Sequence, residues 1–140
     1  GRVSSSNVSV SNLVNNSGVV AADVTGVGTA RYSLAAAGYG STGQAIVGYG
    51  KTSSAVSMTN KVSNLGVVAT DVSGVGTSRW NLAATSYGGD KAIFAYGEVL
   101  GTVWLSMSNL VNNTGVVAAD VTGVGTARYG LAAANFSYSA

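Results

Sequence analysis

The 140-residue sequence contains no cysteine, no histidine and no proline, and only 9% of its residues are charged. Without cysteine the chain has no disulfides, thiolate nucleophile or cysteine-type zinc site, and without histidine it has no catalytic triad. No apolar run approaches the roughly 20 residues that a membrane-spanning helix needs. The net charge of +2 comes from scattered cations, so a nucleic-acid partner and membrane insertion are not expected.

Small and polar uncharged residues fill the chain instead, with 20 glycines and a hydrophobic fraction of 46%. Disordered chains combine low hydrophobicity with high net charge, which is the reverse of this composition. The five acidic residues are widely spread and form no local carboxylate pair or metal-coordinating loop. We therefore expect no enzyme activity, no metal and no cofactor.

One unit occurs three times, and this repeat is the strongest signal in the sequence. The segment GVVAADVTGVGTARYSLAAA begins at Gly18 and returns in closely similar form at Gly66 and Gly115, with spacings of 48 and 49 residues. We interpret the chain as a single repeat domain over 1–140, with units at approximately 8–55, 56–104 and 105–140, the last truncated. The sequence also predicts that the chain is a processed, fragmentary or engineered piece.

Each unit divides into short β-branched runs separated by turn residues, a pattern typical of strands and not of helices. Four strand types are predicted, named a to d. Strands a are expected at 31–37, 79–85 and 128–134, strands b at 45–50 and 92–97, strands c at 8–13, 56–61 and 105–110, and strands d at 19–24, 67–72 and 116–121. Four strands in about 48 residues predict one blade of a β-propeller; a parallel solenoid or an intertwined fibre would favour shorter periods.

The segment TARYSLAAAGYGSTGQAIVGYG resembles a kelch repeat, although the usual fourth-strand tryptophan is missing and the double glycine appears only as Gly-Tyr-Gly. It is also similar to kelch-like repeats of phage and marine viral surface proteins, in which GVGTARYxLAAAGYG units recur. The resemblance implies an all-β propeller of four-stranded kelch-like blades, about three per chain. Since a ring needs at least about four blades, we expect closure by oligomerisation, preferably a six-bladed homodimer. An extracellular or virion-associated location is favoured.

The TGVGT stretch at Thr25 is the best candidate for a phosphate-binding loop. Such a loop needs a following helix and usually a lysine, whereas a strand follows here. We therefore predict a turn between strands d and a, in which Gly26 and Gly28 adopt positive φ.

Recurrent charged residues flank this turn. Each aspartate precedes an arginine by eight residues, which predicts a structural ion pair across each turn: Asp23 with Arg31, Asp71 with Arg79, and Asp120 with Arg128. A ring of these arginines binding an anion is the alternative.

Aromatic residues beside turn glycines are the remaining candidates for ligand binding, namely Tyr39, Tyr49, Tyr87, Tyr96 and, in the insertion EVLGTVW, Trp104. They could stack on sugars or contact a protein, or they could fill gaps between blades. The sequence favours a structural or adhesive surface module that makes protein–protein contacts. The alternatives are a lectin-like propeller with one shallow carbohydrate site per blade and an engineered or fragmentary propeller that self-assembles.

Overall fold

The computed structural model describes residues 1–135, and within them the protein is all β, as predicted. The described residues contain no helix, so none of them forms a helix that could span a membrane. The strands form five small antiparallel sheets. They are β1 (Arg2–Val3), β2 (Ser6–Asn7), β3 (Ser11–Val14), β4 (Val20–Val24), β5 (Ala35–Tyr39), β6 (Gln44–Gly48), β7 (Thr59–Val62), β8 (Ala83–Tyr87), β9 (Lys91–Ala95), β10 (Glu98–Val99), β11 (Val103–Trp104) and β12 (Ser108–Val111).

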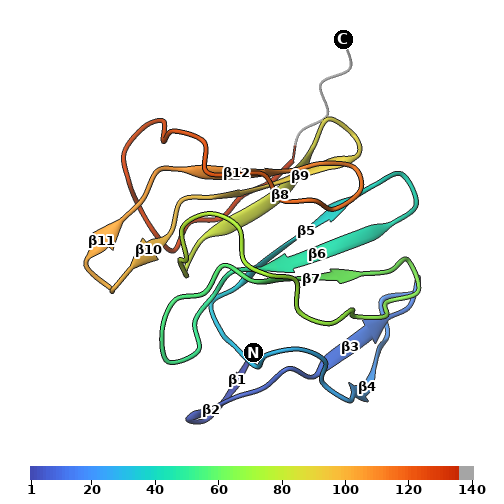
Figure 1. Ribbon diagram of the computed structural model, residues 1–140. Coiled ribbons are helices and arrows are strands. Elements are labelled where there is room, and N and C mark those ends of the chain that lie inside the picture. The colour runs from blue at the N-terminus through green and yellow to red at the C-terminus, as the bar shows by residue number, and fades with distance from the viewer. Residues whose placement is uncertain (136–140) are drawn as a thin grey trace.

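Three layers follow one another from the N-terminal end of the molecule (Figure 1). The N-terminal hairpin consists of β3 and β4; the first three-stranded sheet has the order β5–β6–β7, and the second has the order β8–β9–β12. The same register recurs in both larger sheets, since Ala45 pairs with Val62 in one and Ala92 with Val111 in the other. Strands a, b and c of the repeat therefore lie side by side in chain order.

Strands of type d are shorter than predicted in the second and third units. Only β4 is a full strand, whereas Val68 and Val72 make isolated bridges to β7, and Val117 and Val121 make the equivalent bridges to β12. These bridges place a fourth segment beside each three-stranded sheet. The prediction of a third strand a at 128–134 is wrong: this segment forms no strand, because no strand b lies beside it to complete a ladder among the described residues.

The core lies between the two three-stranded sheets, where β5 packs on β8 and β9. Ile46 and Phe94 are fully buried, and the rings of Tyr49 and Phe94 lie 5.1 Å apart. Gly48 faces Phe94 so closely that a Cβ atom there would lie 2.9 Å from Cζ of the ring. Small residues on one sheet thus leave room for the large ring of the other.

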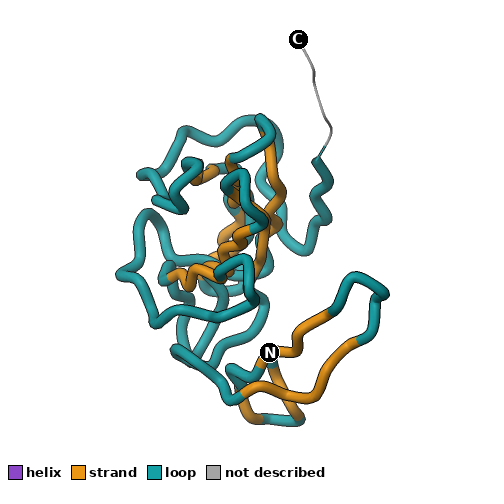
Figure 2. The backbone as a smooth tube through the Cα atoms, turned by 90° about the vertical axis from the view of Figure 1, so that its right-hand side faces the viewer, coloured by secondary structure: helices purple, strands orange, loops and turns teal. Residues whose placement is uncertain are grey.

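The N-terminal hairpin stands apart from this core (Figure 2). It carries exposed valines on both strands, including Val14 and Val20, and Val19, just before β4, is exposed as well. Two short hairpins that the sequence analysis did not predict, β1–β2 and β10–β11, precede the first and third strands of type c. Their equivalent positions show that insertions of this kind occur at one place in the repeat.

Candidate functional site

A buried arginine joins several parts of the first three-stranded sheet to its added fourth segment. Arg31 lies four residues before β5, and its Nε donates to the carbonyl oxygen of Tyr49, after β6, at 2.9 Å. Its Nη2 donates to Oδ1 of Asn60 on β7 at 2.6 Å, and its Nη1 lies 3.7 Å from Oδ1 of Asp71 on the fourth segment. One guanidinium therefore contacts β7, the residue after β6 and the fourth segment at this end of the sheet.

The carboxylate of Asp71 is the acceptor at the far side of this network. It accepts from the Thr29 backbone N–H at 2.9 Å, from the Thr29 hydroxyl at 2.6 Å and from Asn60 Nδ2 at 2.8 Å. Burial opposes ionisation, but these hydrogen bonds and the charge of Arg31 outweigh it and hold the pKa of Asp71 below its ordinary value. Conversely, burial lowers the pKa of Arg31, and the charge of Asp71 partly opposes that shift.

The same network recurs on the second three-stranded sheet. Arg79 is fully buried, its Nε donates to the Tyr96 carbonyl at 2.8 Å, and its guanidinium stacks on the ring of Tyr49 at 4.2 Å from the centroid. Asp120 accepts from the backbone and hydroxyl of Thr77, at 3.0 and 2.7 Å. These bonds, with one from Asn109, outweigh burial and lower the pKa of Asp120.

The two networks differ in the partner of the arginine Nη2, in the ion pair, which joins Arg31 to Asp71 at 3.7 Å, and in the stacking of Arg79 on Tyr49. In the first sheet Oδ1 of the strand-c asparagine accepts from arginine, whereas in the second Nη2 of Arg79 donates to the Phe94 carbonyl at 3.4 Å. Oδ1 of Asn109 is consequently buried without a partner among the described residues.

The predicted pairing of each aspartate with the arginine eight residues later is corrected by this geometry. Arg31 pairs with Asp71 and not with Asp23, and Asp120 accepts from Thr77, two residues before Arg79, the arginine of the preceding unit. The reason is topological: the turn carries the chain from strand d of one sheet to strand a of the next sheet. Residues eight apart therefore belong to different sheets, whereas residues about 40 apart meet at one end of the same sheet.

Each end of the molecule holds one half of this network. Asp23 accepts from Asn12 Nδ2 at 2.8 Å, and both residues are exposed, with no threonine or arginine partner among the described residues. Arg128 is also exposed; it donates to the Thr126 carbonyl at 3.2 Å and stacks on Tyr96 at 4.0 Å. The hairpin thus exposes the acceptor half, and the last turn exposes the donor half.

The glycine-rich turn does hold an anion, but that anion is the chain's own carboxylate. Gly28 has a φ of 76°, as predicted, and a Cβ there would lie 2.5 Å from Oδ1 of Asp71. The backbone at Gly26 does not have positive φ; it needs glycine because the chain at Ser9 passes directly against it. These glycines allow the Thr29 N–H to reach Asp71.

The predicted aromatic residues do not gather into one site. Tyr39 and Tyr49 are buried, Tyr87 and Tyr96 are half-buried, and Trp104 is 52% exposed. The hydroxyl of Tyr49 donates to the Val75 carbonyl at 3.1 Å, so this ring belongs to the packing between repeats. Trp104 instead forms an exposed pair with Tyr129, with ring centroids 5.5 Å apart.

Sequence reasoning missed the uncharged members of the network, which are Thr29, Thr77, Asn60 and Asn109. Their signal was present: a threonine stands two residues before each arginine, and an asparagine stands eleven residues before each aspartate. Among the described residues no group of three His, Cys, Asp or Glu side chains could hold a metal ion.

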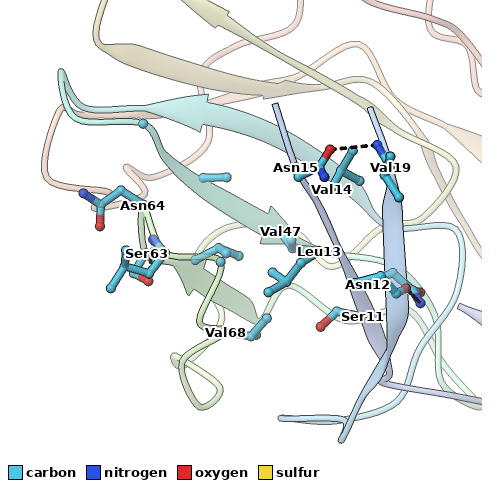
Figure 3. A pocket seen from close by; sticks show the side chains of 16 residues that line it. Ser11, Asn12, Leu13, Val14, Asn15, Val19, Val47, Ser63, Asn64 and Val68 are labelled. Atoms are coloured by element: carbon cyan, nitrogen blue, oxygen red, sulfur yellow. Dashed lines mark hydrogen bonds between the residues drawn. The ribbon is translucent and has the colours of Figure 1, made fainter. Parts of the chain in front are cut away.

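Two cavities lie beside the N-terminal hairpin. The larger, about 720 Å³, lies between β3 and the first three-stranded sheet, where Leu13 points toward Val47 and Val68 (Figure 3). The smaller, about 220 Å³, is lined by Gly1, Val8 and Arg31 among others. Neither the comparison with protein-family models nor that with curated proteins finds a match to this chain.

Proposed function

We propose that this protein is a non-enzymatic structural module, a kelch-like β-propeller of the type found on phage and viral surfaces, which makes protein–protein or adhesive contacts. The repeat supplies the blades: each three-stranded sheet with its fourth segment is one blade. Support comes from the close approach of β5 to β8, since inner strands of neighbouring blades lie nearest to each other in a propeller.

Assembly through a second copy follows from the divided network, which is the observation that carries the proposal. The donor half at Thr126 and Arg128 matches the acceptor half at Asn12 and Asp23, and the equivalent halves meet twice within the chain. Two copies placed about a twofold axis would satisfy both open ends and give about six blades, within the usual range for a closed ring.

The solution mass tests this assembly. We expect twice the chain mass of 13.8 kDa in sedimentation equilibrium, and dissociation to monomers in Arg128→Asp. Asp23→Arg combined with Arg128→Asp restores opposite charges at each junction and should restore the dimer. Arg2→Asp, which also removes an exposed cation, is the matched control and should leave the mass unchanged. A monomeric wild type, or a dimer indifferent to Arg128→Asp, would contradict the proposal.

A second candidate function is carbohydrate binding, favoured by the exposed pair of Trp104 and Tyr129. Aromatic faces of this kind stack on the apolar faces of sugars. A glycan array would identify a ligand, and tryptophan fluorescence would follow its titration. If the fluorescence change is lost in Trp104→Ala and retained in Trp80→Phe, the sugar binds at this pair. If no glycan on the array binds, carbohydrate binding is refuted.

A further inference from the structure

A third cavity, of about 310 Å³, lies at one end of the first three-stranded sheet, where β5 and β7 end and β6 begins. Its lining includes four polar residues and two small apolar residues of the fourth segment, namely Tyr39, Gln44, Lys61, Ser63, Val67 and Ala69. The proposed function uses none of these residues.

Three of the polar residues share one face of the sheet. Tyr39 pairs with Gln44, and Ile46 pairs with Lys61. Partners directly opposite each other lie on the same face, and so do residues two apart in a strand, such as Gln44 and Ile46. Ile46 is fully buried in the core between the two larger sheets. Tyr39, Gln44 and Lys61 therefore converge on the face that packs against the second sheet.

Tyr39 is buried, with only 6% of its surface exposed, yet its hydroxyl makes no hydrogen bond among the described residues. The ring is held in place by the turn of the third unit, because a Cβ atom at Gly115 would lie 2.6 Å from the ring Cζ. Burial raises the pKa of Tyr39, so the hydroxyl keeps its proton at neutral pH. It is a buried donor that lacks an acceptor.

The other polar residues also have donors to spare. Lys61 Nζ donates to the Thr114 carbonyl at 2.9 Å, which leaves two N–H groups, and Lys61 forms no ion pair among the described residues. Oε1 of Gln44 accepts from the Thr42 hydroxyl at 3.1 Å, so its amide nitrogen is the available group. The Ser63 oxygen accepts from two backbone N–H groups of the following turn, at 3.3 and 3.1 Å, and its proton remains available.

Two of these donors are departures from the repeat. The end of strand c reads LVN at 13–15 and at 110–112, but KVS at 61–63. Both replacements, Lys61 and Ser63, line the cavity. Packing alone does not require a charge at this position, since leucine occupies it in the other two units.

We propose that this cavity binds a small hydroxylated carboxylate, no larger than one sugar ring, such as a hexuronate. The Lys61 ammonium would meet the carboxylate, because charge-assisted hydrogen bonds are the strong ones. Tyr39, Gln44 and Ser63 would donate to the remaining oxygens. The described lining contains no acidic residue, so an anion is favoured over a cation.

Size and apolar surface narrow the ligand further. Small-molecule pockets range from about 300 to 1,000 Å³, and this cavity lies at the lower limit, which fits a single ring. Val67 and Ala69 offer apolar surface to the carbon atoms of the ring. This inference goes beyond the proposed assembly and does not need it, since every residue of the site belongs to one copy.

The experiment follows the amide resonances of the ¹⁵N-labelled protein during titration with sodium glucuronate, with glucose and with inorganic phosphate. Resonances of residues 39–44 and 61–67 should shift saturably with glucuronate. The midpoint should lie at a concentration about tenfold lower than that for glucose, which has the same ring without the carboxylate. Phosphate has the charge without the ring and should bind at least about tenfold more weakly than glucuronate.

Lys61→Leu, which introduces the leucine of the other two units, should abolish the preference for glucuronate over glucose. Lys61→Gln retains a donor for the Thr114 carbonyl and should abolish the preference as well, which separates the charge from the structural bond. Lys51→Leu is the matched control: it removes a half-buried lysine that stacks on Trp80 outside the cavity, and it should retain the preference.

Trp104→Ala should also retain the preference, which separates this site from the exposed aromatic pair. The inference is overturned by any of four results: no saturable shift with glucuronate, equal affinity for glucose, equal affinity for phosphate, or a preference that survives in both Lys61 variants. A monomeric protein that binds glucuronate in this cavity would refute the proposed ring and leave this site standing.

Discussion

Replacement of Arg79 by methionine tests whether the buried arginine holds its sheet together. The side chain is fully buried, and its guanidinium makes bonds of 2.8 and 3.1 Å to the carbonyls of Tyr96 and Thr77 and stacks on Tyr49. Methionine has a similar length and is apolar, so Arg79→Met removes these bonds while filling much of the space.

The size of the effect can be worked from these contacts. Each hydrogen bond to a charged group contributes about 1.5–3 kcal/mol, and a desolvated cation–π contact contributes up to about 2 kcal/mol. Relief of the cost of burying the charge offsets part of this sum. We expect a net destabilisation of about 3 kcal/mol, which lowers the midpoint of thermal unfolding by about 9 °C in a chain of this size.

Arg128 provides the matched control because it occupies the same position of the repeat at an exposed site. It makes one bond, to the Thr126 carbonyl, and one stacking contact, with Tyr96. Arg128→Met should therefore change the free energy of unfolding by about 0.5 kcal/mol or less. Urea unfolding of both variants, followed by circular dichroism at a concentration where the protein is monomeric, measures the difference. Equal effects in the two variants, or a neutral Arg79→Met, would refute the reasoning.

Three further predictions concern pH and packing. The folded pKa values of Asp71 and Asp120 lie below the ordinary 3.8, so the stability that they contribute is complete above that pH and is lost as pH falls through the folded values. In the double variant Asp71→Asn with Asp120→Asn, the free energy of unfolding should therefore depend less on pH in acid. An unchanged dependence on pH would contradict this. Burial raises the pKa of Tyr49 above 10.0, so the protein should lose stability above that pH, and in absorbance titration Tyr49→Phe should remove one tyrosine that ionises above pH 10.0. Gly48→Ala should destabilise the protein by about 1–3 kcal/mol, because its methyl group would collide with Phe94, and combination with Phe94→Leu should recover part of the loss in urea unfolding.

The sequence alone was sufficient for the class of structure and for most of the strands. Alternating, β-branched runs between glycines predict short strands wherever they lie, and the predicted strands a, b and c correspond to β5, β6, β7, β8, β9, β12 and part of β3. The repeat also predicted the same role for equivalent side chains, which holds for the networks of Asp71 and Asp120 but not for the exposed Asp23 and Arg128. These properties depend on local backbone preference and on periodicity, and both can be determined from the order of residues along the chain.

Tertiary structure decided which residues meet. Proximity in sequence predicted Asp23 with Arg31, but Arg31 lies across one sheet from Asp71, because the turn that joins them in sequence separates them into different sheets. It also decided that 128–134 is not a strand, although its sequence nearly repeats 31–37, because a strand needs a neighbour to pair with. Local sequence determines what a segment is able to form, and only its partners in space determine whether it forms it.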